Sequence, residues 1–384
     1  MHRGWAEARR IARDAVKPLE AVELPLAEAL GRALASPVRA LTAMPAYDNS
    51  AMDGYAVAGP GPWTVVGAVR AGGEPYPGVL APGTAIEIAT GAPVPPGTQA
   101  VLPVEYAVHS GRRVAGEVAS GKHVRRRGED CPEGEELLAT STTVTAAVLG
   151  AAAAAGHDTL LVHRRPRVSV VVTGDEVQTS GVPAPGRVRD AIGPMLPGLL
   201  AEAGAEEHGL VQPADQPTAL TAALTEGDAD VVVVCGATSK GPADHLRGVL
   251  RALLADVRVD GVACRPGHPQ LLAVLPDGRC VTGLPGNPFA ALAAGLTLLS
   301  PLLLRLGGHR APPPATARAG AALPVHERDT RLVPVAWSGR SVTPVGHDRP
   351  GSLWGAALAD ALAVVPPGFA GGDLELLPLP GGRR

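Results

Sequence analysis

The spacing of apolar positions changes along the chain, and each change indicates a different kind of structure. Near the start, apolar residues recur at the spacing of an amphipathic helix: Trp5, Ala8, Ile11, Ala12 and Ala15. Pro18 ends this helix, and residues 26–34 predict a second one. Short runs that alternate apolar and polar residues, such as 63–69 and 85–89, then lie between Gly and Pro clusters. Such runs are typical of a small β-rich domain.

Beyond the β-rich block, an alanine-rich stretch predicts a helix over 143–155 that ends at Gly156. Helical patterns therefore lie on both sides of the block. We predict that residues 41–124 form a β-rich domain inserted into an elongated helical domain, which is made of residues 1–40 and 125–165.

Strand and helix patterns alternate over residues 166–310: 168–172, 194–203, 217–226, 230–235, 245–255 and a long helix after Pro288. This alternation predicts an α/β domain with a doubly wound, mostly parallel sheet. After the stiff linker 311–314, the last part of the chain reads as short strands. We therefore predict that residues 311–384 form a small C-terminal β-barrel domain.

The first candidate site lies where the apolar run 168–172 stops. Thr173 and Gly174 end the run, and two acids, Asp175 and Glu176, follow at once. Open α/β sheets bind ligands at the carboxyl ends of their strands, so these acids would face a site. The alternative is a surface turn whose acids are solvated. The other loops of the region decide between the two interpretations.

The loop 235–244 follows another predicted strand and leads into a helix. Its backbone amides and the helix N-terminus would form a phosphate cradle. Thr238 and Ser239 would add hydroxyl donors, and Lys240 a positive charge. Asp244 could instead be a helix N-cap with no other role.

Two more loops have the same character. Residues 265–269 place Arg265, which suits an oxyanion, and the imidazole of His268 on a rigid turn. The alternative is a structural turn with solvated ends. Residues 283–288 end a strand and begin the long helix, with Asn287 as the candidate N-cap and free amides that would favour an anion. Four such loops at successive strand ends predict a cleft that binds phosphate or an oxyanion.

Two polar turns lie in the β-rich block. Residues 48–57 contain Asp53, and residues 90–95 contain the hydroxyl of Thr90. Their spacing alone assigns them no role. A hard cation such as Mg²⁺ takes carboxylate oxygens together with substrate phosphates. The candidate carboxylates for such a cation are Asp53, Asp130, Asp175, Glu176 and Asp244.

Composition limits the class of protein. The chain has 384 residues, 46% of them hydrophobic, with 48 glycines and 39 prolines, which indicates a loop-rich folded protein of several domains. With 34 basic and 37 acidic residues, we expect no nucleic-acid and no membrane partner. The 4 cysteines lack the spacing of a metal or disulfide framework, and the longest apolar stretch, 289–304, is interrupted and short for a membrane span. We expect a cytoplasmic protein.

Six segments together resemble the MoeA family, the molybdopterin molybdenumtransferases, whose eukaryotic relatives include the gephyrin E domain. They are Asp-Asn-Ser-Ala-Met-Asp-Gly-Tyr-Ala-Val (48–57), Thr-Gly-Ala-Pro-Val-Pro (90–95), Arg-Arg-Arg-Gly-Glu-Asp (125–130), Thr-Gly-Asp-Glu (173–176), Gly-x-x-Ser-x-Gly-x-x-Asp (236–244) and Gly-Leu-Pro-Gly-Asn-Pro (283–288). The first and the last are the most specific. The likeness spans nearly the whole chain in the right order.

The resemblance implies a four-domain, elongated homodimer in which residues 166–310 are a molybdopterin-binding domain related to MogA. The inserted domain of one subunit would face that domain of the other, so Asp53 and Thr90 would complete the partner's site. The implied reaction uses adenylylated molybdopterin (molybdopterin-AMP), molybdate and Mg²⁺, releases AMP and delivers molybdenum to the dithiolene sulfurs. A MogA-like adenylyltransferase and apo-molybdoenzymes are the candidate protein partners.

The resemblance also assigns roles to residues. Asp53, Glu176 and Asp244 are the expected catalytic residues and metal ligands. The expected residues that bind substrate or molybdopterin are Thr90, Asp130, Thr173, Gly174, Asp175, Gly236, Ser239, Lys240, Arg265, His268, Pro285, Gly286 and Asn287.

The chain departs from the family pattern near the expected oxyanion site. Residues 190–192 read Asp-Ala-Ile where the family has Asp-Ser-Asn, so two polar groups are lost. His268 stands where the family has lysine, and we expect Lys240 to restore that positive charge. The retained carboxylates favour an active insertase. The lost Ser and Asn favour the alternative, a catalytically weakened paralogue that binds molybdopterin as a carrier or scaffold.

Overall fold

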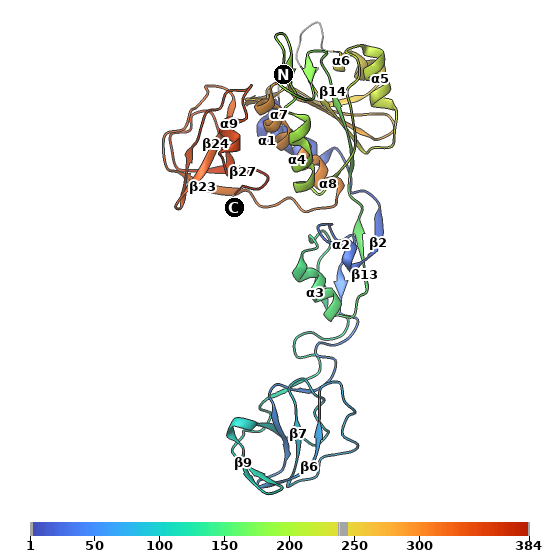
Figure 1. Cartoon of the computed structure of the whole chain (residues 1–384), viewed down its shortest axis with the longest axis vertical. Coiled ribbons are helices and arrows are strands. Elements are labelled where there is room, and N and C mark those ends of the chain that lie inside the picture. The colour runs from blue at the N-terminus through green and yellow to red at the C-terminus, as the bar shows by residue number, and fades with distance from the viewer. Residues whose placement is uncertain (1–2, 237, 239–244, 383–384) are drawn as a thin grey trace.

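The computed structural model describes residues 3–236, 238 and 245–382. The molecule is elongated, with two units side by side at one end, a small unit in the middle and a β unit at the other end (Figure 1). We call them the α/β unit (167–306 with the first helix), the barrel unit (315–378), the middle unit (21–34 with 142–163) and the inserted unit (49–125).

A six-stranded sheet forms the centre of the α/β unit, in the order β17-β14-β18-β22-β21-β19. The first four strands are parallel. β21 runs antiparallel to both of its neighbours, β22 and β19, so β19 has the same direction as the first four strands. The predicted mostly parallel sheet is therefore confirmed. The strands are β14 (Arg167–Val172), β17 (Glu206–Val211), β18 (Val231–Cys235), β19 (Asp256–Asp260), β21 (Leu271–Val274) and β22 (Cys280–Leu284).

Helices cover both faces of this sheet because its valine-rich strands are apolar on both sides. Successive residues of a strand point to opposite faces. Accordingly, Val170 and Val233 pack in one core with α4 (Leu196–Glu202). Val171 and Val232 pack in a second core with helices on the other face. Those helices are α5 (Pro217–Thr225) and α6 (Leu246–Ala252).

The long predicted helix is present as α7 (Pro288–Ala294), a π-helical turn (Gly295–Leu299) and α8 (Ser300–Leu306). This helix of 19 residues is long and apolar enough to cross a membrane, since an 18-residue window of it has a mean hydropathy of 1.8. However, 78% of that window is buried inside the protein. The first helix, α1 (Trp5–Asp14), packs on it, and the Trp5 Nε1–H group donates a hydrogen bond to Thr297 Oγ1 over 3.1 Å. This long helix is therefore the core helix of the α/β unit.

The middle unit is a two-stranded ladder covered by short helices. β2 (Ala21–Pro25) pairs antiparallel with β13 (Thr159–His163), and α3 (Ala146–Ala154) packs beside them. The helix predicted at 26–34 is only one turn, α2 (Leu26–Ala29). It stops because Gly31 has a φ of +77° and the residues after it form β-bridges.

The chain leaves the middle unit and returns to it along paired strands. β3 (Val38–Arg39) pairs with β12 (Glu136–Leu138), and β4 (Asn49–Ser50) pairs with β11 (Val124–Arg125). The segment between β4 and β11 in the sequence forms the six-stranded sheet of the inserted unit, in the order β8-β5-β7-β6-β10-β9. Its strands are β5 (Gly54–Ala58), β6 (Trp63–Val69), β7 (Thr84–Ile88), β8 (Ala100–Pro103), β9 (Val108–Ser110) and β10 (Arg113–Ala115).

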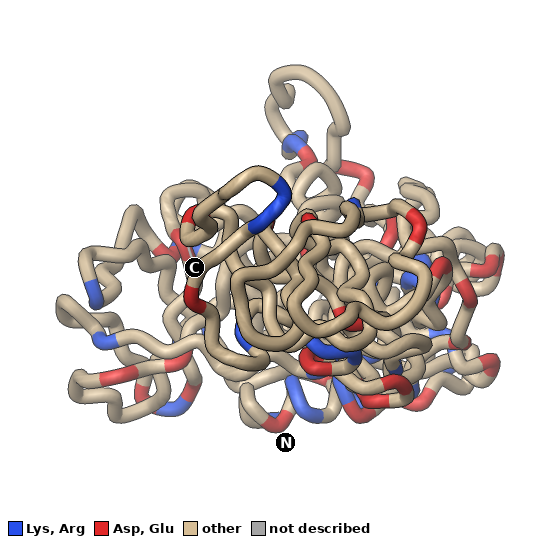
Figure 2. Tube along the Cα trace, turned by 90° about the horizontal axis from the view of Figure 1, so that it is seen from below, with Lys and Arg blue, Asp and Glu red and all other residues tan. Residues whose placement is uncertain are grey.

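The barrel unit closes because β24 pairs with both β25 and β26. It is joined to the α/β unit through β20 (Val262–Arg265), which pairs with β24 and with β1 (Arg3–Gly4). The barrel strands are β23 (Ala315–Ala319), β24 (Thr330–Ser338), β25 (Ser341–Pro344), β26 (Ala361–Val365) and β27 (Asp373–Pro378). Basic and acidic positions are interspersed along the trace (Figure 2).

Candidate functional site

A cleft of about 630 Å³ lies where β14, β18 and β22 end in the α/β unit. We call it the Glu176 cleft. It brings together residues from four of the predicted loops, as expected for the carboxyl edge of a parallel sheet. Its lining includes Thr173, Gly174, Glu176, Val188, Arg189, Asp190, Ala191, Ile192, Asp215, Gly236, Thr238, Pro269, Pro285, Gly286, Asn287 and Gly351.

A glycine turn positions the Glu176 carboxylate. The hydroxyl and the amide of Thr173 both donate to the carbonyl of Cys235, at 2.9 and 3.0 Å, which ties the end of β14 to the end of β18. Gly174 follows with a φ of +110°, and a Cβ there would lie 2.7 Å from Glu176 Oε2. Only glycine lets this carboxylate fold over the turn. Among the described residues, none donates a hydrogen bond to it.

Two more glycines bring the neighbouring loops together. Gly236 has a φ of +91°, and a Cβ on it would lie 2.7 Å from Thr173 Oγ1. A Cβ on Gly286 would lie 3.8 Å from the Gly236 Cα. The amide of Gly236 donates to the carbonyl of Leu284 over 2.9 Å. Because backbone meets backbone here, the cleft keeps open space where side chains would otherwise stand.

The two acids of the first motif separate. Glu176 lines the cleft, whereas Asp175 Oδ1 accepts the amide of Asp215 over 3.3 Å. The divergent triplet 190–192 forms the facing wall. Asp190 Oδ1 accepts the amides of Ile192 and Gly193, at 2.9 and 3.0 Å. Ile192 is 6% exposed and belongs to the apolar core, so this wall presents the methyl group of Ala191 without a hydroxyl.

The expectation of free amides at the start of the long helix is wrong for its first turn. The amides of Phe289 and Ala290 donate to the carbonyl of Pro350, at 2.9 and 3.3 Å. Asn287 makes no side-chain cap hydrogen bond. The barrel unit thus covers this helix end, and its Gly351 lines the cleft. No local pattern predicts this contact, since the carbonyl comes from a distant part of the chain.

The loop 265–269 contributes Pro269 to the lining. The Nε–H group of Arg265 donates to Asp329 Oδ2 in the barrel unit over 2.7 Å, and its side chain is 58% exposed. The Nδ1 atom of His268 lies 2.8 Å from the carbonyl oxygen of Val262. Three other predicted site residues, Ser239, Lys240 and Asp244, lie outside the described residues.

Asp53 and Thr90 meet in the inserted unit. The amide and the hydroxyl of Thr90 donate to Asp53 Oδ1, at 2.6 and 3.0 Å. These two hydrogen bonds, chiefly the one from the amide, hold the pKa of Asp53 below its usual range. Asp53 lines a depression of about 390 Å³, the Asp53 pocket. Residues of β5, β6 and β7, and Arg70 directly after β6, line it as well: Gly54, Tyr55, Val69, Arg70, Glu87 and Ile88.

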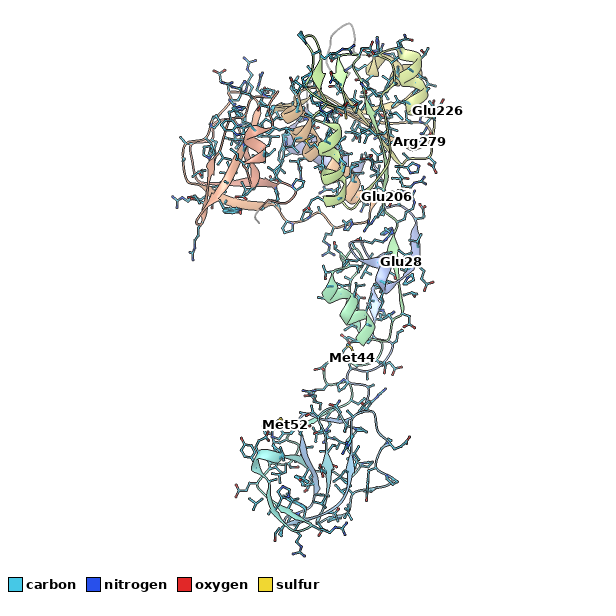
Figure 3. All side chains as sticks on the ribbon, in the orientation of Figure 1. Glu28, Met44, Met52, Glu206, Glu226 and Arg279 are labelled. Carbon is cyan, nitrogen blue, oxygen red and sulfur yellow. The ribbon has the colours of Figure 1, made fainter. Side chains whose placement is uncertain are left out.

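Within one chain, the Asp53 pocket and the Glu176 cleft lie in units at opposite ends of the molecule (Figure 1). Met52, the neighbour of Asp53, lies at the end of the inserted unit that is nearer the middle unit (Figure 3). Asp130 belongs to neither site. Its amide donates to the carbonyl of Met44 over 3.0 Å, in the segment between the middle and inserted units.

The described residues gather no group of three His, Cys, Asp or Glu side chains that could hold a metal ion. Three carboxylates, Glu176, Asp190 and Asp215, nevertheless line the same cleft. Mg²⁺ is commonly held by one or two carboxylates together with substrate phosphates. Glu176, whose carboxylate accepts no hydrogen bond from the described residues, fits that arrangement.

The mostly parallel sheet with a glycine-lined cleft at its strand ends defines an α/β ligand-binding protein, extended here by three further units. Three family models cover the chain: the MoeA N-terminal region (domain I and II) at 3–156, a probable molybdopterin binding domain at 169–305 and the MoeA C-terminal region (domain IV) at 316–374. The chain belongs to the MoeA family.

Relatives and solved structures agree with these matches. A molybdopterin molybdenumtransferase of Nostoc sp. is 32% identical over 398 residues, covering 96% of this chain and 90% of that protein. Molybdopterin molybdenumtransferase 2 of Mycobacterium tuberculosis is 35% identical over 324 residues, covering 78% and 79%. A crystal structure of the molybdopterin biosynthesis MoeA protein from Pyrococcus horikoshii, 27% identical, covers 98% of this chain and 99% of its own with a TM-score of 0.81.

Proposed function

We propose that this protein inserts molybdate into adenylylated molybdopterin and releases AMP in a Mg²⁺-dependent reaction. Its relatives are named molybdopterin molybdenumtransferases, which makes it a transferase of molybdenum cofactor biosynthesis. The position of the Glu176 carboxylate is the observation that supports the proposed Mg²⁺-dependent insertion with release of AMP. This carboxylate is held over Gly174 in a glycine-lined cleft, and the described residues give it no hydrogen-bond donor.

The residues of the cleft have separate tasks in this proposal. The glycine turns at 174, 236 and 286 leave room for phosphate groups to approach the backbone. Glu176, with Asp244 beyond the described residues, would hold Mg²⁺. When bound, Mg²⁺ would neutralise the charge that develops as the phosphoanhydride bond breaks. In the net change, one water adds across the phosphoanhydride bond, which frees AMP and leaves a phosphate on the pterin. The two dithiolene sulfurs replace oxygens of molybdate, which leave as water or hydroxide, so the oxidation state of molybdenum does not change.

The proposal extends to a homodimer whose site is shared between subunits. Asp53 is held in place by two hydrogen bonds from Thr90, and its lowered pKa keeps it ionised at neutral pH. Its pocket lies at the other end of the molecule from its own cleft (Figure 1). We infer that Asp53 and Thr90 of one subunit complete the Glu176 cleft of the other. This arrangement would bring together the carboxylates of Asp53 and Glu176, which lie far apart within one chain.

The second candidate function is a weakened paralogue that binds molybdopterin without inserting molybdenum. One observation favours it: the wall at Ala191 and Ile192 offers a methyl group and a core residue to the cleft. A hydroxyl or amide at such a wall would donate hydrogen bonds to an oxyanion. The retained carboxylate of Glu176 favours the enzyme, since a binding protein has little need of a cation ligand.

One assay separates the two functions. Purified protein is incubated with adenylylated molybdopterin and Mg²⁺, with or without molybdate, and AMP is measured over time. The insertase should release AMP in a molybdate-dependent manner, and omission of Mg²⁺ should suppress the release. Binding of the adenylylated pterin, followed by calorimetry, serves as the control. Intact binding without molybdate-dependent AMP release would rule out the insertase and support the carrier.

A further inference from the structure

The middle and inserted units, residues 20–163, form an arm that projects from the α/β unit (Figure 1). The inserted unit at the far end of this arm holds the Asp53 pocket. Where Asp53 can act therefore depends on the direction in which the arm leaves the α/β unit. That direction is set at the junction between β13 and β14, where the chain passes through Arg164.

Arg164 bridges the two sides of this junction. Its Nη1 and Nη2 groups donate to the two carboxylate oxygens of Asp230, at 2.6 and 2.7 Å. Its Nε group donates to Glu20, the residue that precedes β2 of the arm. Two parallel hydrogen bonds to one carboxylate fix the angle of a guanidinium as well as its distance. Arg164 thus holds the base of the arm against the start of β18.

Asp230 is itself rigid. Its Oδ2 atom accepts the amide of Arg167 over 2.8 Å, and its backbone bonds to Arg167 and Cys280 within the central sheet. The Asp230 side chain is 13% exposed and that of Arg164 is 26% exposed. A pair that is shielded from water to this degree is screened less than a surface pair.

A second set of contacts at the junction is closely packed. The amide of Leu19 donates to the carbonyl of Leu306 over 2.8 Å, and His163 Nδ1 lies 2.7 Å from the carbonyl oxygen of Leu19. A Cβ on Gly308 would lie 2.0 Å from the ring of His163. The end of α8 therefore contacts the base of the arm in addition to the Arg164 ion pair.

The junction between the middle and inserted units is held differently. Arg126 pairs with Asp48 beside the paired strands β11 and β4, with side chains that are 55% and 37% exposed. Arg127 pairs with Glu133, with side chains that are 56% and 61% exposed. Exposed pairs of this kind contribute little to stability. The Arg164 pair with Asp230 is thus less exposed than these two pairs.

We propose that Arg164 is a positioning residue, which fixes the arm on the α/β unit so that Asp53 is delivered at a set place. The proposal rests on the proposed sharing of the site between subunits. Arg164 does not line the cleft, so its removal should leave substrate binding to one subunit nearly intact. It should lower the rate of the step that requires Asp53 of the partner subunit.

The test measures the arm and the reaction in the same variants. Spin labels are attached at Glu226→Cys, directly after α5, and at Ala147→Cys on α3, both exposed, and labelled chains are diluted with unlabelled ones. The native cysteines are all buried, so they do not compete for the label. Arg164→Ala should broaden the distance distribution between the labels. It should lower kcat for AMP release roughly 10- to 100-fold, with KM for the adenylylated pterin within about twofold of wild type.

Arg167→Ala is the matched control, because it removes an arginine whose partner, Asp228, is 68% exposed and lies within the same unit. It should leave the distance distribution and kcat unchanged. Arg164→Lys keeps the charge but loses the two-point contact, and it should fall between wild type and Arg164→Ala in both measurements. If Arg164→Ala does not fold, the comparison of Arg164→Lys with wild type, in the label distances and in kcat, tests the proposal instead.

Two results would overturn the proposal: a distance distribution that stays as narrow as in wild type, or a broadened one with unchanged kcat. The distance measurement does not depend on activity. If the wild-type protein releases no AMP, the proposed function fails, and the labels still decide whether Arg164 holds the arm.

Discussion

The Glu176 cleft and the Asp53 pocket both lie at strand ends, but they prepare their carboxylates in opposite ways. Asp53 Oδ1 accepts two hydrogen bonds from Thr90, which fix the side chain and lower its pKa. Glu176 accepts none from the described residues and is placed by the space above Gly174. The first arrangement suits a charge that must stay in one position. The second suits a carboxylate whose oxygens are kept for a ligand.

The two sites also differ in their walls. The cleft is built from backbone turns and apolar strand ends of a sheet that is covered on both faces. The pocket is smaller, at about 390 Å³ against about 630 Å³, and its lining comes from β5, β6 and β7 and the residues that flank them. In the proposed shared site, the cleft would bind most of the substrate and the pocket would add a charge to it.

We expect the largest effect from variants that test whether the cleft and the pocket form one active site. Glu176→Ala and Asp53→Ala should each lower molybdate-dependent AMP release by about 100-fold or more, because each removes a charge from the reacting centre. If the site is shared between subunits, a dimer formed from one chain of each kind keeps one intact site. Random mixing should therefore restore about a quarter of wild-type activity, since half the dimers are mixed and each has one of two sites.

The control for mixing is each variant refolded with itself, which should gain nothing. Formation of mixed dimers is followed with two different affinity tags. Mixed dimers that remain as inactive as the parents would contradict the shared site and would favour two independent sites.

The next effect concerns how Glu176 is placed. Gly174→Ala puts a methyl group 2.7 Å from Glu176 Oε2 at a φ of +110°, so the carboxylate must move. We expect a loss of roughly 10- to 100-fold in kcat/KM and of about 1–3 kcal/mol in the free energy of unfolding. AMP release and chemical denaturation measure the two losses.

Gly181→Ala is the matched control for this change. Gly181 has a φ of +71°, and the nearest atom to a Cβ there is Gln178 Nε2 at 3.6 Å. It should show backbone strain with near wild-type activity. Equal activity losses in the two variants would mean that strain, and not the position of Glu176, matters.

A smaller effect is expected at the pocket. Thr90→Val removes the hydroxyl donor but keeps the amide donor to Asp53. Because hydrogen bonds to the carboxylate lower the pKa of Asp53, losing one raises that pKa, and Asp53 should become protonated at higher pH. The acidic limb of the pH profile of kcat/KM should therefore move to higher pH. At neutral pH the loss should be at most about tenfold, the equivalent of one hydrogen bond.

Thr90→Ser keeps the hydroxyl and should lie closer to the wild-type profile than Thr90→Val. An acidic limb that does not move in Thr90→Val would exclude Asp53 as the group that controls it.

The smallest effect is expected at the divergent wall. Ala191→Ser returns a hydroxyl to the cleft and should lower the KM for molybdate by about two- to fivefold. Ala201→Ser, at an exposed position of α4, serves as the control and should not change it. A higher KM in Ala191→Ser would indicate that the oxyanion binds elsewhere. The neighbouring Ile192 cannot be replaced as easily, because its side chain is part of the core.

Much of the fold was predictable because it depends on local patterns. The valine-rich strands, the alternating helices and the β-rich insertion follow from residue spacing. The motif around Gly174 predicted a site at a strand end, and the cleft lies there. Predictions failed where a local pattern met a distant contact. The helix at 26–34 stops after one turn because Ala33 and Leu34 form β-bridges with the distant residues Thr143 and Val162.

The candidate site could be predicted only in part. The sequence placed Glu176, Gly236 and Gly286 at neighbouring strand ends, and these residues line one cleft. It did not predict that Pro350 covers the first turn of α7 or that Asp329 pairs with Arg265. Both contacts come from the barrel unit, whose position depends on the pairing of β20 with β24.

The sequence by itself determined which groups are available: the Asp53 and Glu176 carboxylates, the glycines around the cleft and the apolar replacement at 191–192. These depend on residue identity and on spacing within one turn or strand. Only the tertiary structure decided where the groups stand, with Asp53 at one end of an arm and Glu176 at the other end of the molecule. Distances between units depend on junctions such as Arg164 with Asp230, which join residues far apart in sequence and leave no periodic pattern.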